Sequence, residues 1–274
     1  MRLVEIKARD GISIPCGIWD AGGDIILYLH GIESHMGWFE DMARKLQSKG
    51  FAVYAFDRRG SGISKEARGD TESYKTLMND IEDVVYSIRT RRPDGKLYLM
   101  GVCGGGKFAA SFAGYRPEEV DGLILISPAI KTKVTLALKD KLDALVSSFL
   151  NPAKKIHTPL NDEMFTENKR YADFIKNDPL KLRELTARFY RELVMMDIFL
   201  SRRIKSVDMP ILSVLAGDDD IVDNEKLKAW HNGLRARDKT LKVFEECRHF
   251  LPFDGNVDDV VDFVTRWIKE RGGR

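Results

Sequence analysis

Short apolar runs alternate with longer amphipathic segments over much of the chain. Several runs are apolar throughout, which is typical of strands buried on both faces of a sheet. The segments between them repeat apolar positions every three to four residues, which predicts helices. We expect strands at 24–31, 51–56, 96–102, 120–127, 209–217 and 240–246, and helices at 37–50, 73–91, 104–115, 223–236 and 256–270.

The N-terminal strands differ from the others in being predicted as antiparallel. Residues 2–8 and 12–19 alternate in a way that is typical of a hairpin, with a turn at Asp10-Gly11. After this hairpin, strands alternate with helices. The fold class predicted is therefore α/β, with a mostly parallel, doubly wound sheet covered by helices on both faces.

Residues 129–208 break this alternation. They contain amphipathic stretches at 133–150 and 178–204 and no convincing strand. The sequence therefore predicts a core formed by 1–128 and 209–274, with a helical cap, or lid, inserted at 129–208 over one end of the sheet.

Composition favours a soluble globular protein. With 274 residues, 43% of them hydrophobic, the chain can bury a full core. The 44 Lys and Arg residues nearly balance the 42 Asp and Glu residues, so the charge gives no reason to expect a nucleic-acid partner. There is no signal-peptide pattern and no run of about 18 apolar residues that would span a membrane. Three widely spaced cysteines suit neither disulfides nor zinc, so we expect a cytoplasmic protein without metal or cofactor.

The stretch GVCGG, residues 101–105, lies between an expected strand and an expected helix. Its pattern is Gly-x-nucleophile-x-Gly, in which small neighbours let the backbones pass closely while the central side chain projects above the sheet. The start of the following helix favours an anion, which suits the thiolate of Cys103. A small buried cysteine in a glycine-rich turn is the alternative. We favour the nucleophile.

A nucleophile of this kind needs a general base and a carboxylate that orients the base. In doubly wound hydrolases the acid and then the histidine follow the nucleophile, on loops after later strands. His249 is the only histidine after the last expected strand and is the predicted base. The acid should follow the preceding strand, where Asp218, Asp219 and Asp220 remain equal candidates. Asp223 is expected to cap the next helix.

The oxyanion of the reaction needs two hydrogen-bond donors. One should be the amide of Gly104, directly after the nucleophile, and the other the amide of Ile32, in the loop after the strand at 24–31. His30 precedes this loop and is expected to be a hydrogen-bonded scaffold. His231 lies among polar residues of a predicted helix, which favours a surface position.

Together these motifs resemble the α/β-hydrolase superfamily, specifically its monoacylglycerol lipase and lysophospholipase branch. The matching stretches occur in the family's order and span nearly the whole chain: LHGIESH (29–35), FDRRGSGIS (56–64), GVCGG (101–105), NKRYADFIKNDPL (168–180), PILSVLAGDDDIVD (210–223) and DKTLKVFEECRH (238–249). The resemblance implies Asp220 as the acid, through a Gly-x-x-Asp pattern that begins at Gly217. It also implies a cap that shapes an acyl-chain pocket with His35 beside it, and Glu33 of the same loop is a further predicted substrate-binding residue.

The resembled branch uses serine where this chain has Cys103. Cysteine occupies this position in some relatives, such as dienelactone hydrolases, polyhydroxyalkanoate synthases and bile-acid acyltransferases. A thiolate leaves a tetrahedral intermediate more readily than an alkoxide, so a cysteine favours thioesters or activated esters. The sequence therefore predicts an acyl hydrolase that forms an acyl-thioester intermediate from a lipid-like ester or thioester. An acyltransferase to an amine or alcohol is the alternative, and a non-catalytic ligand-binding relative is less favoured.

Residues 131–151 of the predicted cap have apolar positions at helical spacing, with lysines nearby. We expect this helix to pack on the pocket, and a lid that transiently touches a membrane to collect lipid is the alternative. A zinc site at Cys103, Cys247 and His249 is a weaker alternative, because a Cys-x-His pair is not specific. The predicted partner is a small acyl substrate.

Overall fold

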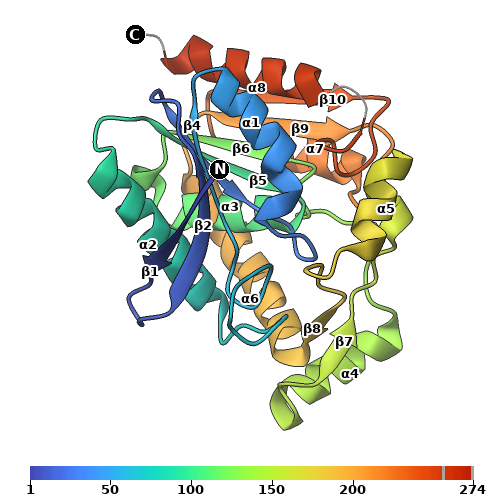
Figure 1. The fold of residues 1–274 in the computed structure, drawn as a ribbon. Coiled ribbons are helices and arrows are strands. Elements are labelled where there is room, and N and C mark those ends of the chain that lie inside the picture. Colours follow the sequence, from blue (N-terminus) through green and yellow to red (C-terminus); the bar gives the residue numbers. More distant parts are fainter. Residues whose placement is uncertain (255–256, 273–274) are drawn as a thin grey trace.

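An eight-stranded sheet runs through the molecule with helices on both faces (Figure 1). The computed structural model describes residues 1–254 and 257–272. In their order across the sheet, the strands are β1 (Arg2–Lys7), β2 (Ser13–Trp19), β4 (Ala52–Phe56), β3 (Ile25–Leu29), β5 (Leu97–Val102), β6 (Gly122–Ile126), β9 (Ile211–Ala216) and β10 (Lys239–Phe244). The pairs β1–β2 and β2–β4 are antiparallel and the other pairs are parallel, which confirms the predicted α/β class.

Helices from different parts of the chain cover the two faces of the sheet. They are α1 (Glu40–Ser48) and α8 (Val257–Gly272) on one face, and α2 (Tyr74–Arg91), α3 (Gly104–Tyr115) and α7 (Asn224–Asn232) on the other. Strand β3 shows why both faces are apolar: Ile25 and Leu27 pack with α2 and α3, whereas Ile26 and Tyr28 pack with α1 and α8. The expected ends of these elements differ from the observed ones by at most four residues. The expected start of the last helix, at 256, lies outside the described residues.

The described segment between β6 and β9 adds no strand to this sheet. We call residues 129–208 the cap. It contains α4 (Leu138–Leu150), α5 (Lys169–Asn177) and α6 (Ala187–Arg203), and a two-stranded ribbon of β7 (Lys155–His157) and β8 (Glu184–Thr186). The sequence did not predict the ribbon, because three-residue strands are too short to show an alternating pattern. The helix expected from 178 begins only at Ala187, where the side chain of Thr186 caps it by accepting from the amide of Phe189.

The loops after β3, β5, β9 and β10 leave the sheet at the same edge, because these strands are parallel. These loops carry Ile32, Cys103, Asp219 and His249. The cap leaves β6 at this edge as well. The fold therefore gathers the predicted chemical groups under the cap. Within the part of the chain that the structure describes, no helix is both long enough and apolar enough to cross a bilayer.

Candidate active site

Cys103 occupies a strained turn between β5 and α3. Its φ is 54° and its ψ is −125°, a conformation that residues other than glycine seldom adopt. Both flanking glycines are required by close packing: a Cβ on Gly101 would collide with the carbonyl of Gly105, and a Cβ on Gly105 would collide with the carbonyl of Leu29. The GVCGG pattern thus places the Cys103 thiol at the corner expected from the sequence.

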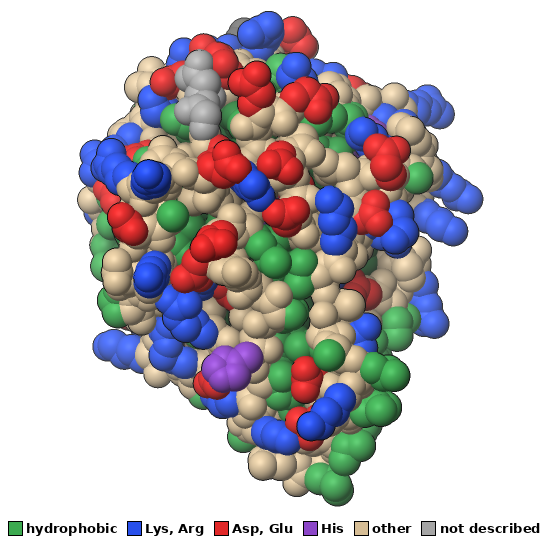
Figure 2. Space-filling view, turned by 90° about the vertical axis from the view of Figure 1, so that its right-hand side faces the viewer, with side chains coloured by type: hydrophobic (Ala, Val, Ile, Leu, Met, Phe, Trp, Pro, Cys, Tyr) green, Lys and Arg blue, Asp and Glu red, His purple; other side chains and the backbone are tan. Residues whose placement is uncertain are grey.

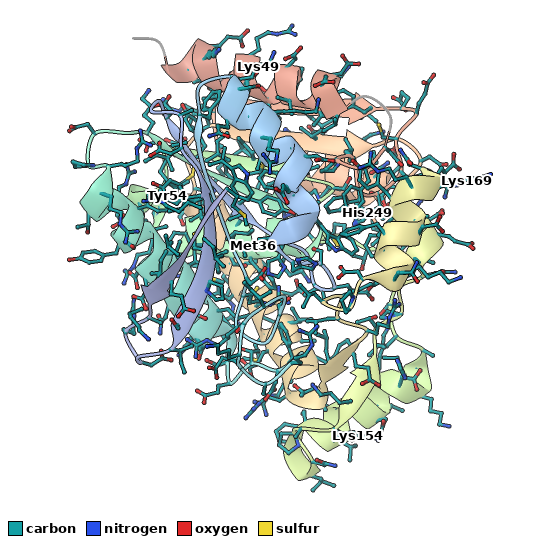
Figure 3. The ribbon with its side chains drawn as sticks, viewed as in Figure 1. Met36, Lys49, Tyr54, Lys154, Lys169 and His249 are labelled. Carbon is teal, nitrogen blue, oxygen red and sulfur yellow. The ribbon has the colours of Figure 1, made fainter. Side chains whose placement is uncertain are left out.

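The carboxylate that the structure brings to His249 is that of Asp219. Nδ1 of His249 lies 2.9 Å from both carboxylate oxygens of Asp219, and both side chains are completely buried. Figure 3 shows His249 on the side of the molecule that carries α5. Asp220 instead is exposed and pairs with Arg248 at 2.6 Å. The structure therefore brings Asp219 to His249, and not Asp220, which the resemblance implied as the acid.

The backbone of the loop after β9 decides which aspartate turns inward. Oδ1 of Asp219 accepts hydrogen bonds from the amides of Ile221 and Val222, each at 2.8 Å. These bonds close a tight turn and draw the Asp219 carboxylate into the protein, while Asp218 and Asp220 on either side point outward. Asp223 caps α7 as expected, because its side chain accepts from the backbone of the helix.

The buried pair and the thiol form one electrostatic unit. Burial alone would lower the pKa of His249, but the negative charges of Cys103 and Asp219 outweigh burial and raise that pKa to about 10. Burial would raise the pKa of Asp219, but the charge of His249 and hydrogen bonds hold it below its usual range. Nε2 of His249 is buried and forms no hydrogen bond of regular geometry among the described residues. Cys103 is nonetheless close enough to His249 to raise its pKa by a side-chain interaction as well as by charge.

The two amides predicted as oxyanion donors lie close together. A Cβ built on Gly104 would lie 3.1 Å from the backbone nitrogen of Ile32, and one on Gly31 would lie 3.2 Å from Cβ of Cys103. As the first residue of α3, Gly104 has no acceptor within the helix. Neither amide donates to another backbone group within the described residues. Both donors are thus available next to the thiol.

The other histidines have structural partners. His30 is the expected scaffold: its Nδ1 donates to the carbonyl of Gly31 at 2.8 Å, and its Nε2 accepts from the amide of Arg58 at 3.1 Å. Burial lowers the pKa of His30 well below its ordinary value, so this histidine is neutral. His231 was expected at the surface but is buried, with Nδ1 2.8 Å from the hydroxyl of Ser213. Burial lowers the pKa of His231 to about 4.

His35 and Glu33 do not line the cavity beside the thiol. Nε2 of His35 lies 2.9 Å from the carboxylate of Asp178, and Glu33 forms a buried ion pair with Lys181 at 2.9 Å. Through these contacts, both side chains join the loop after β3 to the cap. That His35 and Glu33 bind substrate therefore stays a prediction, and the contacts observed here are with residues of the cap. Sequence spacing found their loop but could not show the direction of their side chains.

The thiol of Cys103 lines a cavity of about 690 Å³ between the sheet edge and the cap. This volume suits a small-molecule ligand. The lining is mainly apolar and comes from α4, α6 and the segments beside them; it includes Val134, Leu145, Phe149, Leu160, Leu193 and Val194. Lys107, one of the charged side chains in the lining, is paired with Asp197 at 2.8 Å. The sequence predicted such a pocket under the cap but not the residues from α6.

Helix α4 also exposes apolar side chains, and Phe149 belongs both to this exposed set and to the cavity lining. Leu138, Phe149 and Leu150 have relative exposures of 74%, 69% and 82%. In Figure 2, hydrophobic side chains gather on the narrow lower end of the molecule, the end to which α4 belongs in Figure 1. Within residues 1–254 and 257–272, no group of three or more His, Cys, Asp or Glu side chains is arranged to hold a metal ion. The alternative zinc site therefore has no support.

Comparisons with known proteins agree with this architecture. Residues 23–256 match the model of the family described as serine aminopeptidase, S33. Monoglyceride lipase of Mus musculus is 26% identical over 276 residues, covering 98% of this chain and 91% of that protein. Phospholipase YtpA of Bacillus subtilis (strain 168) is 27% identical over 241 residues, covering 86% and 91%. The crystal structure of Paleococcus ferrophilus monoacylglycerol lipase has a TM-score of 0.84 at 21% identity and covers 99% of this chain and 100% of that one. The chain therefore belongs to the serine aminopeptidase S33 family, is a hydrolase of the α/β-hydrolase fold, and resembles the monoglyceride lipase and lysophospholipase branch as its motifs predicted.

Proposed function

We propose that this hydrolase cleaves acyl esters or thioesters, with Cys103 as nucleophile, His249 as general base and Asp219 as the acid that orients it. The position of Cys103 carries the proposal. Its thiol lies at a strained turn, lines an apolar cavity of about 690 Å³, and has the buried His249–Asp219 pair as an electrostatic partner. Such a cavity can hold an acyl chain while the sulfur reaches the acyl carbon. Relatives named monoglyceride lipase and phospholipase support a lipid ester as substrate.

The reaction would proceed in two halves. The thiolate of Cys103 attacks the carbonyl carbon, and the carbonyl electron pair moves to oxygen, where the amides of Ile32 and Gly104 donate to it. The bond to the leaving group breaks as the imidazolium of His249 gives that group its proton, which leaves an acyl-thioester on Cys103. In the second half His249 takes a proton from water, and the resulting hydroxide attacks the carbonyl carbon of the thioester. The bond to sulfur then breaks, which releases the carboxylic acid product and restores the thiolate of Cys103.

The sulfur nucleophile favours some substrates over others. A tetrahedral intermediate made from an oxyester can expel either an alkoxide or the thiolate, and the thiolate leaves more readily because thiols are the stronger acids. An intermediate made from a thioester has two matched leaving groups. We therefore expect Cys103→Ser to lose less turnover on oxyesters than on thioesters. Equal losses on both classes would show that the sulfur has no such preference.

The exposed apolar side chains of α4 support transient contact with a lipid surface. Leu142, Leu145 and Val146 are exposed there, next to Lys139 and Lys141, and Leu145 also lines the cavity. A helix with an apolar face and lysines beside it binds lipid interfaces. In a sedimentation experiment, a fraction of the protein should pellet with anionic vesicles. Leu142→Glu should reduce this fraction without changing turnover on a water-soluble ester. Equal pelleted fractions of both proteins would contradict the contact.

Intact-protein mass spectrometry tests the proposed chemistry directly. The protein is mixed with a panel of acyl esters and thioesters of different chain length, and a mass increase equal to the acyl group is expected on wild-type protein but not on Cys103→Ala. The fate of the adduct then distinguishes two activities: release as free acid indicates hydrolysis, and transfer to added glycerol or amine indicates the acyltransferase. Absence of any adduct across the panel would favour the ligand-binding relative.

A further inference from the structure

A charged side chain lies buried directly behind the oxyanion loop. Arg58, in the loop after β4, is only 5% exposed. Its Nη1 donates to the carbonyl of Gly31 at 3.2 Å, and its Nη2 donates to the carbonyl of Ile32 at 3.1 Å. The guanidinium carbon lies 5.3 Å and 5.5 Å from the ring centres of Phe108 and Phe189. Two backbone carbonyls and two aromatic faces therefore surround the charge.

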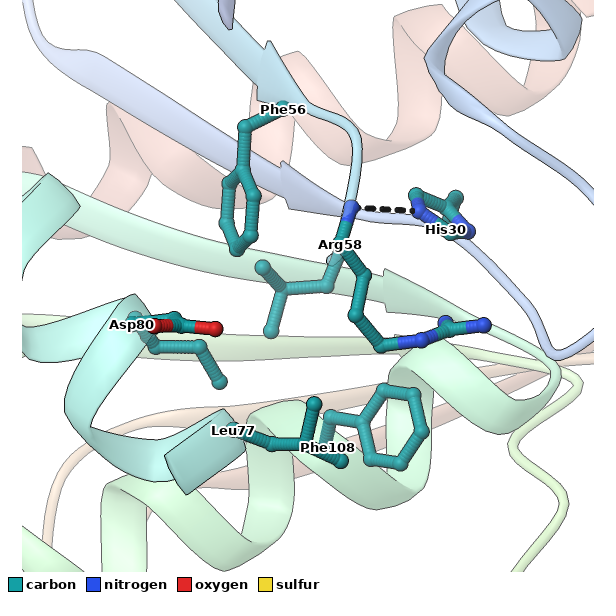
Figure 4. A pocket seen from close by; sticks show the side chains of 8 residues that line it. His30, Phe56, Arg58, Leu77, Asp80 and Phe108 are labelled. Atoms are coloured by element: carbon teal, nitrogen blue, oxygen red, sulfur yellow. Dashed lines mark hydrogen bonds between the residues drawn. The ribbon is translucent and has the colours of Figure 1, made fainter. Parts of the chain in front are cut away.

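The neighbouring arginine shows how unusual this surrounding is. Arg59 pairs with the carboxylates of Asp80 and Asp10, as buried arginines commonly do. Arg58 forms no ion pair within the described residues, and its Nε has no hydrogen-bond partner there. Figure 4 shows its side chain extending past His30 and alongside Phe108, beside a cavity of about 20 Å³. The charge of the buried neighbour Asp57 acts on Arg58 without a direct ion pair. A buried cation without a direct carboxylate partner is costly, so packing alone does not account for it.

The contact with Gly31 acts on the group that the reaction needs. The carbonyl of Gly31 and the amide of Ile32 belong to one peptide group, and no cis peptide bond occurs within the described residues. In a trans peptide the C=O and N–H point in opposite directions. Arg58 and His30 both donate to this carbonyl, from 3.2 Å and 2.8 Å. They fix the plane of the peptide with its N–H toward the side where Gly104 lies.

The charge also changes the strength of that N–H. A hydrogen bond accepted at a carbonyl polarises the peptide and makes its N–H a stronger donor, and the effect is larger in a buried site. Burial lowers the pKa of Arg58 to about 10, so the side chain is still a cation at neutral pH. Its positive charge lies behind the position where negative charge develops in acyl transfer.

We propose that Arg58 is a positioning residue of the oxyanion hole, which holds and polarises the Gly31–Ile32 peptide so that the Ile32 amide binds the oxyanion. The inference rests on the proposed function, because it assumes that Cys103 adds to a carbonyl carbon. It goes beyond that function in assigning part of the stabilisation to a side chain that touches neither substrate nor thiol.

A long-chain alkyl trifluoromethyl ketone is the probe that isolates this effect. The thiolate of Cys103 adds to its carbonyl carbon, the carbonyl electron pair moves to oxygen, and no group leaves, so the adduct carries a lasting oxyanion. Iodoacetamide is the matched control reagent, because displacement of iodide by the same thiolate forms no oxyanion. We expect Arg58→Met to weaken ketone binding about 10- to 100-fold, while alkylation of Cys103 changes less than about twofold.

Two further variants separate position from stability. Arg58→Lys keeps the charge but loses the two-pronged contact, so we expect an intermediate loss, and it replaces Arg58→Met if that variant does not fold. Arg59→Met removes a neighbouring arginine that does not touch the oxyanion loop, and ketone binding should change less than about threefold. Melting temperatures identify conditions in which each variant is folded.

The outcomes distinguish the two proposals. Wild-type ketone affinity in folded Arg58→Met, or equal losses of ketone binding and alkylation, would overturn the role of Arg58. A wild-type protein that is alkylated but binds no ketone would overturn it as well. Ketone binding that depends on Arg58, together with no acyl adduct from any ester or thioester, would support the role of Arg58 and contradict the proposed function.

Discussion

Two groups of charged side chains occupy the same two loops and behave in opposite ways. Asp219 and His249 are completely buried and face each other. Their immediate neighbours in the sequence are Asp218, Asp220 and Arg248. The two aspartates are exposed, and both pair with the partly buried Arg248. One residue along the chain thus separates a buried ion pair from a surface ion pair.

The difference shows that environment, and not residue type, sets the chemistry. Burial weakens the screening between the two charges of this pair, so each partner shifts the pKa of the other in the direction that keeps both ionised. In the exposed cluster Arg248 also reaches Glu167 of the cap, at 2.6 Å, and solvent screens all of its interactions. We therefore expect function to depend on the first group and hardly at all on the second.

The largest expected effect separates Asp219 from Asp220. Asp219→Ala should lower kcat/KM about 10²- to 10⁴-fold on whichever acyl substrate the wild type accepts, because His249 loses the group that orients and stabilises its charged form. Asp220→Ala should change kcat/KM less than about threefold, because among the described residues the Asp220 side chain bonds to Arg248 and not to His249. Steady-state kinetics on both variants measures this directly.

Unfolding midpoints serve as the control for that pair of variants. Both proteins should be folded at the assay temperature, and Asp219→Asn offers a variant of unchanged size. A larger loss in Asp220→Ala than in Asp219→Ala would mean that the loop after β9 adopts another register during the reaction, in which the acid is the one that the Gly-x-x-Asp pattern selected.

The fold could be predicted from the sequence to a large extent, because long apolar runs and helical periods depend on burial alone. The GVCGG turn was also predictable, since Gly101 and Gly105 leave no room for another residue. The ribbon of β7 and β8 was not predictable from the sequence. Its strands have three residues each and form by pairing with each other, which a local sequence pattern does not show.

The site was predictable as a set of loops but not in every side chain. Three consecutive aspartates carry no difference in sequence, and the choice of Asp219 depends on two backbone hydrogen bonds within its turn. His35 and Glu33 were placed in the correct loop, but their partners Asp178 and Lys181 lie about 150 residues away in the cap, and sequence spacing does not reveal such contacts.

A smaller effect concerns the reactivity of the three cysteines. The raised pKa of His249 keeps its imidazolium charged up to about pH 10, so the thiolate of Cys103 keeps its partner throughout the neutral range. Iodoacetamide should therefore alkylate Cys103 readily at neutral pH. Burial raises the pKa of Cys16 to about 12 and also raises that of Cys247, so both should react slowly.

Variants of the two charge groups sharpen this labelling experiment. In His249→Ala the rate of Cys103 alkylation should fall at least about tenfold at neutral pH, because the thiol loses its charged partner. In Asp220→Ala the rate should not change. Peptide mapping after labelling identifies the cysteine. An unchanged alkylation rate in His249→Ala would contradict the thiolate–imidazolium pair.

The smallest expected effect is that of Arg248, the centre of the exposed cluster. Arg248→Ala removes its ion pairs with Asp218, Asp220 and Glu167, and we expect the free energy of unfolding to fall by about 1 kcal/mol or less. At about 1 M salt the loss of unfolding free energy should be smaller still, because dissolved ions then screen charge interactions beyond a distance of about 3 Å. Urea unfolding at low and high salt measures both values, and turnover should remain within about twofold of wild type. A loss of several kcal/mol that persists at high salt would show that Arg248 holds the cap to the His249 loop by interactions that solvent does not screen. Arg248 would then behave like a member of the buried group, which contradicts the contrast drawn between the two groups.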